Sequence, residues 1–244
     1  AHMGILYDDI YLRHLTGAGH PECPERLEAI ASAFREGGIF ERCQKIKPRE
    51  ATVEEIALVH SQEYIEKLSG IRLPEGRFLY LDPDTPVSPE SYHVAKIAVG
   101  GLLNTIDFVA GGNRAFAFLR PPGHHAEKNR GMGFCLFNNV AIAARYAQRR
   151  HKITKVLIVD WDLHHGNGTQ HAFYDDESIL YFSTHQYPYY PGTGSWDETG
   201  TGKGVGFTVN VPLPSGQGDQ EYILFFQEIL RPIAKSFSPD LILV

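Results

Sequence analysis

The sequence predicts an α/β fold with a mostly parallel sheet. Short apolar runs alternate along the chain with segments of helical periodicity, an order that is typical of layered α/β folds. The runs are apolar at nearly every position rather than at every second one, which indicates strands buried on both faces, as in parallel sheets. The runs that carry this prediction are 5–7, 115–119, 156–159, 179–182, 207–211 and 241–244.

Four segments between these runs have the periodicity and the end signals of helices. Pro24 and Gly37 stand at the start and the end of the first segment, where proline and glycine are favoured. Ser88 precedes the second, and an asparagine pair (138 and 139) precedes the third, as N-cap residues do. Pro232 predicts a kink in the last. The four segments are 24–37, 89–109, 138–150 and 219–237.

Composition indicates a globular protein that does not bind nucleic acid directly. Of the 244 residues, 43% are hydrophobic and 21% are charged, which is the balance of a packed domain. The formal net charge of −6 provides no basic field for phosphates. Three cysteines without paired spacing favour a reducing compartment, so we expect a cytoplasmic protein. No apolar run approaches the roughly 20 residues of a membrane helix, so no membrane span is expected.

Both ends of the chain carry an expectation. Residues 1–3 look like a vector-derived scar, so the one expected domain spans 4–244. Residues 241–244 have the signature of a buried strand, and no turn or cap follows them. A central strand with nothing after it predicts that further sequence belongs to this domain. The oligomeric state is left open.

A candidate metal site follows the run 156–159. Alternate side chains of an extended chain share a face, so Asp160, Asp162 and His164 can all point towards one spot. That spot lies beyond the carboxyl end of a strand, where open α/β sheets bind ligands. Carboxylate and imidazole suit zinc, although manganese or iron also accept them. The alternative is an Asp that caps the next helix, but burying two carboxylates without a cation is costly.

The metal site needs a ligand that this segment does not supply. A catalytic zinc takes three protein ligands and leaves one position open. Asp162 and His164 are the two credible ligands, and Asp160 is better used to support a histidine from behind. His185, after a neighbouring strand, is a weaker candidate. We expect the third ligand beyond Val244.

Two long segments rich in glycine, proline and aromatic residues, 120–137 and 185–206, predict functional loops. His124 and His125 lie in the first, directly after a predicted strand. Two imidazoles beside a metal-activated water provide the base and the acid that amide hydrolysis requires. Surface His-His pairs commonly have no function, so this mechanistic fit carries the prediction. No residue is an obvious oxyanion donor.

Five motifs are spread in order over residues 20–194: HPECPERLEAI, LDPDTPVSPESY, RPPGHHAEKNRGMGFCLFNNVAIAARYA, VLIVDWDLHHGNGTQHAFY and YPGTG. Together they resemble the class II branch of the histone deacetylases and the bacterial histone deacetylase-like amidohydrolases. The resemblance implies an arginase/deacetylase fold with helices on both faces of a central sheet. It also implies a zinc-dependent amidohydrolase that removes acetyl or other acyl groups from lysine side chains of peptides and proteins, or from related amines.

The resemblance assigns individual roles. Asp162, His164 and a further Asp hold zinc, and His124 and His125 are the acid/base pair, with Asp160 orienting His124. Asn167 stands where class I enzymes carry an Asp that supports the second histidine. The acyl-lysine tunnel is lined by Gly133, Phe134 and Tyr190, and Asp84 binds substrate backbone at its rim. A potassium ion beside the zinc is bound through Asp160, Asp162, His164, Ser183 and Thr184.

The sequence departs from the family after 241–244, where family members carry the third zinc ligand and, later, a Gly-Gly-Tyr turn whose Tyr stabilises the oxyanion. A polypeptide that ended at Val244 is therefore expected to bind zinc poorly and to be nearly inactive. Two alternatives stay open. An arginase-like two-manganese enzyme needs an Asp where Gly166 stands, and a non-catalytic acyl-lysine binding module needs only the pocket. Acyl length and physiological substrate are not predicted.

Overall fold

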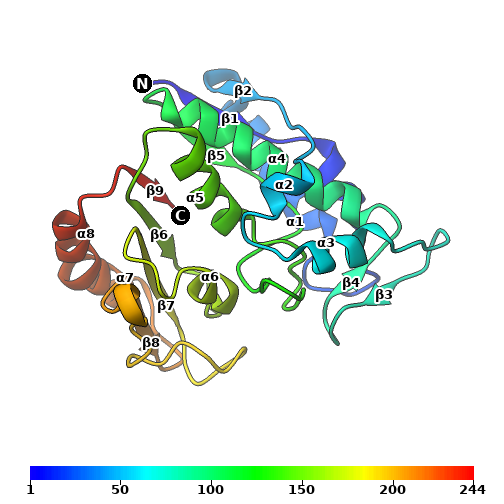
Figure 1. Ribbon diagram of the computed structural model, residues 1–244. Coiled ribbons are helices and arrows are strands. Elements are labelled where there is room, and N and C mark those ends of the chain that lie inside the picture. Colours follow the sequence, from blue (N-terminus) through cyan, green and yellow to red (C-terminus); the bar gives the residue numbers. More distant parts are fainter. The chain divides into compact units, whose positions relative to one another are not determined.

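The computed structural model describes residues 1–244, which divide into two compact units, 1–147 and 148–244. Each unit contains a parallel sheet with helices packed against it (Figure 1). The predicted α/β class with parallel strands is confirmed: each unit has one parallel sheet, and the first unit also has a short antiparallel pair of strands. The single domain expected over 4–244 stays a prediction.

The first unit has a three-stranded parallel sheet of order β2-β1-β5. β1 (Met3–Leu6) is the central strand, flanked by β2 (Gln44–Ile46) and β5 (Arg114–Ala117). Met3 pairs with Arg114, and the carbonyl of His2 accepts the N–H of Arg114 (3.0 Å). Met3, which we expected to lie outside the domain, therefore belongs to β1, and His2 is hydrogen-bonded beside it.

A long helix, α4 (Ser91–Ala110), packs against this sheet. Glycine permits its close approach, because a Cβ at Gly100 would lie 2.1 Å from the carbonyl oxygen of Arg49, and one at Gly101 would lie 2.4 Å from Tyr11 Oη. The helix begins later than predicted. Ser88 does not cap it, and its own N–H donates to Ser91 Oγ (2.8 Å).

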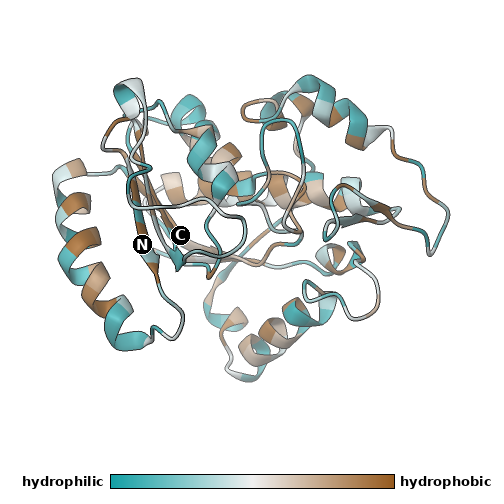
Figure 2. Ribbon diagram, turned by 90° about the horizontal axis from the view of Figure 1, so that it is seen from below, coloured by the Kyte–Doolittle hydropathy of each residue, from teal (hydrophilic) through white to brown (hydrophobic).

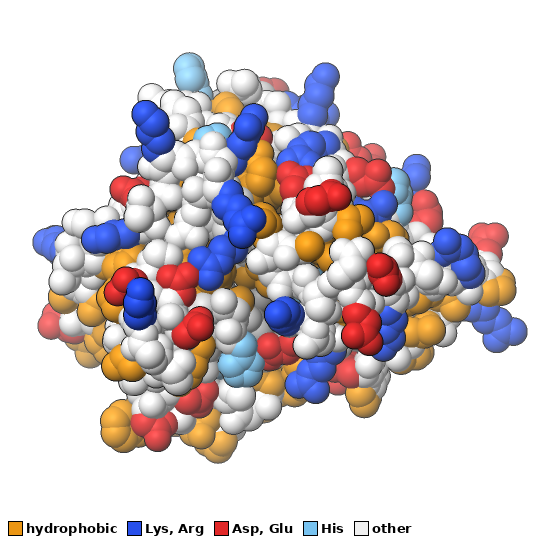
Figure 3. All heavy atoms as spheres, viewed as in Figure 1, with side chains coloured by type: hydrophobic (Ala, Val, Ile, Leu, Met, Phe, Trp, Pro, Cys, Tyr) orange, Lys and Arg blue, Asp and Glu red, His pale blue; other side chains and the backbone are white.

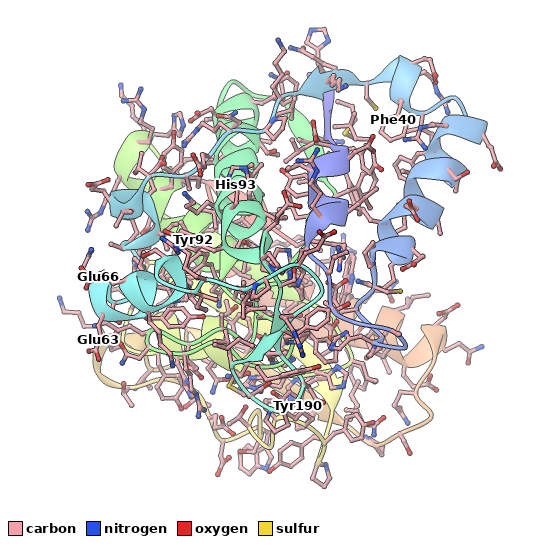
Figure 4. The ribbon with its side chains drawn as sticks, turned by 90° about the vertical axis from the view of Figure 1, so that its right-hand side faces the viewer. Phe40, Glu63, Glu66, Tyr92, His93 and Tyr190 are labelled. Carbon is pink, nitrogen blue, oxygen red and sulfur yellow. The ribbon has the colours of Figure 1, made fainter.

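α4 is also long and apolar enough to cross a membrane by length and composition, with a mean hydropathy of 1.2 over an 18-residue window. The individual apolar runs did not predict this. Half of that window is buried inside the structure, as in the core helix of a soluble protein, so the helix is weak evidence for a span. Two consecutive residues of α4 point in different directions (Figure 4). The Tyr92 ring lies 6.2 Å from the Phe137 ring, while His93 lies at the surface beside Glu50.

Two further helices of this unit confirm their predicted end signals. α1 (Pro24–Glu36) starts with its proline and has Gly37 as C-cap. α5 (Asn139–Arg150) follows Asn138, whose Oδ1 accepts the N–H of Ala141 (3.2 Å), which is an N-cap bond. The elements of this unit that we did not predict are short: β2, α2 (Val53–Ile56), α3 (Gln62–Ser69), the antiparallel pair β3 (Leu79–Tyr80) and β4 (Pro86–Val87), and the 3-10 turns Asp9–Arg13 and Phe40–Arg42.

The second unit is built on a four-stranded parallel sheet of order β8-β7-β6-β9. All four strands were predicted, and each matches within a few residues. They are β6 (Val156–Asp160), β7 (Ile179–Gln186), β8 (Thr208–Leu213) and β9 (Leu241–Leu243). The register pairs Asp160 with Ser183, so the carboxyl ends of β6 and β7 carry neighbouring polar side chains.

A helical segment over the predicted range covers one face of this sheet. It consists of α7 (Asp219–Phe225), a π-helical turn (Phe226–Leu230) and α8 (Arg231–Phe237), and its apolar side chains pack on buried strand residues. Hydrophobic and hydrophilic residues alternate along it (Figure 2). The regular α pattern is interrupted just before Pro232, where the ring and the missing N–H disfavour it. The second unit also has α6 (Asn167–Ala172) and a 3-10 turn at Gly202–Gly204, which we did not predict.

Candidate metal and acid-base site

The two predicted zinc ligands are adjacent at the end of β6. Asp162 Oδ1 accepts the backbone N–H of His164 (2.7 Å) and lies 3.3 Å from His164 Nδ1. The two side chains remain 52% and 35% exposed, respectively. Carboxylate oxygen and imidazole nitrogen therefore lie side by side where solvent or a cation can reach them.

Asp160 is held from two sides. Its Oδ1 accepts the N–H of Asp162 (3.2 Å), and its Oδ2 accepts the hydroxyl of Tyr181 (3.0 Å). Burial and the charge of Asp160 raise the pKa of Tyr181, so the hydroxyl stays protonated and donates. A fixed, negatively charged Asp160 suits the supporting role predicted for it, and its contact with His124 stays a prediction.

The side chains at this site supply fewer ligands than a catalytic zinc ion requires. No group of three or more His, Cys, Asp and Glu side chains is placed to hold a metal ion. Asp162 and His164 fit zinc in kind, and they supply two of the three protein ligands that a catalytic zinc takes. The third ligand expected outside residues 1–244 stays a prediction.

His185, the weaker candidate for a third ligand, has both ring nitrogens engaged. Its side chain is fully buried, Nε2 donates to the carbonyl of Gly194 (2.6 Å), and Nδ1 accepts the hydroxyl of Ser183 (2.8 Å). Burial lowers its pKa, so the ring is neutral. With these partners His185 orders the structure around it and has no nitrogen left for a metal.

Two of the five residues predicted to bind potassium, Ser183 and Thr184, lie in the second half of β7 and are fully buried. Because the Ser183 hydroxyl donates to His185, its oxygen lone pairs remain available. Thr184 Oγ1 is buried and has no hydrogen-bond partner. Successive side chains of a strand point to opposite faces of the sheet, so the Thr184 hydroxyl does not face the same ion as Ser183 Oγ. The lone pairs that remain on Ser183 Oγ fit a cation such as potassium.

The loop 187–207, which follows β7, places aromatic rings against His164. The Tyr189 ring stacks on the His164 ring with centroids 5.4 Å apart and planes 18° apart. The Tyr190 ring meets it edge-on at 6.0 Å and is 41% exposed (Figure 4). Tyr190, predicted to line a tunnel, thus lies next to a predicted ligand.

Asn167 and His165 are buried directly after this pair of ligands. Asn167 is the first residue of α6, and its predicted role beside His125 stays a prediction. Burial lowers the pKa of His165 to about 4. Its ring is therefore neutral, and its two nitrogens face Thr193 and Gln170 (2.7 and 2.8 Å).

In the first unit, the tandem histidines lie together on the predicted loop. Their ring centroids are 4.0 Å apart, and His125 is only 4% exposed. Gly133 packs on His125 so closely that a Cβ there would lie 2.4 Å from the imidazole Cδ2. The structure therefore joins a predicted tunnel residue to a predicted acid/base residue.

Phe134, another predicted tunnel residue, is fixed by contacts that the sequence did not reveal. Its N–H donates to Thr85 Oγ1 (3.0 Å), and its ring meets the His20 ring edge-on at 4.7 Å. His20 also donates from Nε2 to the carbonyl of Asp84 (2.9 Å), while Nδ1 accepts the N–H of Glu22. The Asp84 side chain is exposed, and its predicted role at the rim stays a prediction.

Comparison with known proteins places this chain in a family. The histone deacetylase domain matches residues 20–244. The chain belongs to the histone deacetylase family. It is 41% identical to a probable deacetylase of Archaeoglobus fulgidus, 46% to an uncharacterised Synechocystis protein and 40% to human histone deacetylase 7. Each match includes 99% of this chain, which spans 67%, 79% and 29% of those proteins, respectively.

A solved structure of the histone deacetylase family extends the comparison to the fold. The crystal structure of the HDA15 HD domain superposes with a TM-score of 0.93 at 40% identity, over 99% of this chain and 71% of that one. The resemblance drawn from the five motifs is therefore confirmed. Family membership favours the deacetylase prediction over the arginase-like alternative.

Proposed function

We propose that this member of the histone deacetylase family is a zinc-dependent amidohydrolase that removes acetyl or other acyl groups from lysine side chains or related amines. The observation that carries the proposal is the pair at the end of β6, where Asp162 Oδ1 and His164 Nδ1 lie 3.3 Å apart. Carboxylate and imidazole in such proximity are ligands that zinc accepts.

Asp162 and His164 hold the zinc ion, together with a third ligand from outside residues 1–244. A bound zinc ion supplies a Lewis acid that polarises the amide carbonyl and makes water more acidic. Asp160 does not need to bind the metal through its side chain. Its Oδ2 accepts the hydroxyl of Tyr181, and it provides a carboxylate that orients a histidine, as in other metal sites.

Proton transfer belongs to the tandem histidines. One ring accepts the proton of the attacking water, and the other gives a proton to the leaving amine. His124 acts with Asp160 as its carboxylate partner. Asn167 provides a neutral amide for His125. Because this amide carries no negative charge, it does not favour the protonated form of the His125 ring.

Substrate and potassium complete the proposal. Gly133, Phe134 and Tyr190 line the acyl-lysine tunnel, and Asp84 contacts the substrate backbone. Potassium binds at Ser183 and Thr184 with backbone atoms of the β6 end, and the buried Ser183 hydroxyl oxygen, which keeps lone pairs for a cation, supports this site. The partners are thus acylated lysine peptides, acylated proteins or acetylated amines.

Acetate release from an acetyl-lysine peptide by the complete, zinc-loaded protein, including the segment that supplies the third ligand, tests the proposal. We expect Asp162→Ala or chelation to abolish release, because loss of a ligand removes the metal, and re-addition of zinc to restore it only in the protein with Asp162. Asp175→Ala, an exposed aspartate of the same unit, is the matched control. Release that persists after chelation contradicts the proposal. Peptide binding without any release would instead identify an acyl-lysine binding module.

A further inference from the structure

Glu198, in the loop 187–207, uses both carboxylate oxygens as acceptors. Oε2 accepts the N–H groups of Gly194 (2.9 Å) and Ser195 (2.7 Å), and Oε1 accepts Gln170 Nε2 (2.7 Å). The backbone carbonyl of Glu198 also accepts Asn210 Nδ2 from β8 (3.0 Å). One partly buried side chain thereby ties its own loop to α6, and its backbone ties the loop to β8.

The charge on Glu198 determines how the side chains of Gln170 and His165 are oriented. An ionised carboxylate only accepts hydrogen bonds, so Gln170 must present its NH₂ group to Glu198 and its carbonyl oxygen to the other side. That oxygen lies 2.8 Å from His165 Nε2, which therefore carries the proton. His165 Nδ1 then accepts the hydroxyl of Thr193 (2.7 Å). The tautomer of the residue next to His164 thus follows from a charge two hydrogen bonds away.

The part of the loop that Glu198 holds also packs on His164, a candidate metal ligand. Gly194, held by Glu198, accepts Nε2–H of His185 through its carbonyl (2.6 Å). Four and five residues earlier in the chain, Tyr190 and Tyr189 contact the His164 ring. Segment 189–195 is therefore anchored at its far end by Glu198 and rests on His164 at its near end.

We propose that Glu198 is a positioning residue that holds the loop segment 189–195, and with it Tyr190, against His164. This inference rests on the proposed function only for its kinetic consequence. Glutamine cannot replace Glu198, because each oxygen faces N–H donors and an amide would turn its NH₂ group towards one of them. Such a donor-donor contact leaves buried polar groups unsatisfied.

The kinetic test compares Glu198→Gln with Glu228→Gln, an exposed glutamate of the same unit. Displacement of Tyr190 from the acyl site raises KM about tenfold in Glu198→Gln with kcat within about threefold, because a binding contact is lost. A purely structural role would lower the active fraction, which reduces apparent kcat and leaves KM unchanged. Unchanged KM in Glu198→Gln would overturn the inference.

A swap of the two side chains tests the pairing itself. In Glu198→Gln with Gln170→Glu, an NH₂ group again faces a carboxylate, so KM returns to within about threefold of the original value. Glu198→Asp keeps both acceptor oxygens at shorter reach and gives an intermediate KM. If both variants fold and the swapped pair has a KM no lower than that of the single Glu198→Gln variant, the inference is overturned.

A measurement without substrate separates this inference from the proposed function. Lys203 provides a trypsin site within the loop. We expect cleavage at Lys203 to be about tenfold faster in Glu198→Gln than in Glu228→Gln, and to slow again in the swapped pair, because local opening exposes the loop. Equal cleavage rates in the two single variants would overturn the inference. A protein with no deacetylase activity that still shows this pattern would contradict the proposed function alone.

Discussion

Neutral histidines at the ends of β6 and β7 are fixed by their hydrogen-bond partners. His165 donates from Nε2 to an amide oxygen, and His185 donates from Nε2 to a backbone carbonyl. Each accepts a hydroxyl at Nδ1. These rings have one defined tautomer each, so the surroundings of His164 are preorganised before any ligand binds.

A glycine provides a comparable constraint for the tandem histidines. Gly133 has φ of 55°, and a Cβ there would overlap the His125 ring at 2.4 to 2.8 Å. We expect Gly133→Ala to lower kcat/KM about 100-fold, since a displacement of about 1 Å in a catalytic group has effects of that order. Steady-state kinetics on an acetyl-lysine peptide measure this.

The control for this prediction is Gly76→Ala. Gly76 has φ of 77°, and a Cβ there would meet no atom within 4 Å. Both substitutions cost about 1 kcal/mol of stability from left-handed backbone, but only the first displaces a histidine. Equal activity of the two variants would show that His125 tolerates the displacement or does not take part in catalysis.

At the scale of elements, the strands that were predicted best are those buried on both faces. β6 has the burial that its apolar run indicated, from Val156 to Val159. β2 escaped prediction because two of its three residues, Gln44 and Lys45, are exposed, and only Ile46 is buried. Periodicity reports burial, so a short edge strand with polar residues gives no signal.

The site was predictable where its residues are neighbours in the chain. Asp160, Asp162 and His164 were found because they alternate after an apolar run. The Tyr181 contact to Asp160 arises from the parallel register of β6 and β7, in which Tyr181 pairs with Ile158. Two partners of Glu198, Gln170 and Asn210, likewise come from α6 and β8. Such contacts depend on tertiary structure, which a single sequence does not encode in its spacing.

Helix α4 yields a stability prediction. Alanine usually stabilises a helix interior relative to glycine by about 0.5 to 1 kcal/mol, but a Cβ at Gly100 would overlap backbone atoms of residues 49–51. We expect Gly100→Ala to lower the free energy of unfolding by about 2 kcal/mol because overpacking distorts the backbone. Gly37→Ala, at a helix end with its nearest atom 3.3 Å away, should change it by less than about 1 kcal/mol. Urea unfolding compares the two variants, and a stabilised Gly100→Ala protein contradicts the prediction.

At the scale of the whole molecule, charge is distributed without a dominant patch on the face shown in Figure 3, where Lys and Arg side chains lie among Asp and Glu side chains. With a net charge of −6, this face offers no basic stripe for phosphates. Acylation removes the positive charge of a lysine, so under the proposed function contacts to a neutral amide matter more than long-range attraction.

Buried neutral histidines make global stability depend on pH. Burial lowers the pKa of His60 to about 4 and that of His14 to about 3. The unfolded chain binds these protons near pH 6.5, so each histidine binds more protons in the unfolded state below that pH. The free energy of unfolding therefore falls as pH drops from about 6.5 towards 4, by up to about 1.4 kcal/mol per pH unit for each group.

Urea unfolding between pH 7.5 and 5 measures this dependence. In His60→Gln the amide oxygen can still accept the N–H of Asn138, which His60 Nε2 accepts now (2.9 Å). We expect the slope below pH 6.5 to be smaller by up to about 1.4 kcal/mol per pH unit. His93→Gln, at an exposed position, should leave the slope nearly unchanged. Identical slopes in both variants would mean that His60 is protonated in the folded state.

The left-handed backbone of Phe134 limits how this position can evolve. Phe134 has φ of 72° and follows Gly133 at 55°, and the two successive N–H groups donate to Asp82 Oδ2 and Thr85 Oγ1. β-branched residues are severely disfavoured in this conformation. Substitutions at this position must therefore avoid valine, isoleucine and threonine. Under the proposed function, this backbone geometry limits which side chains can reshape the predicted acyl-lysine tunnel.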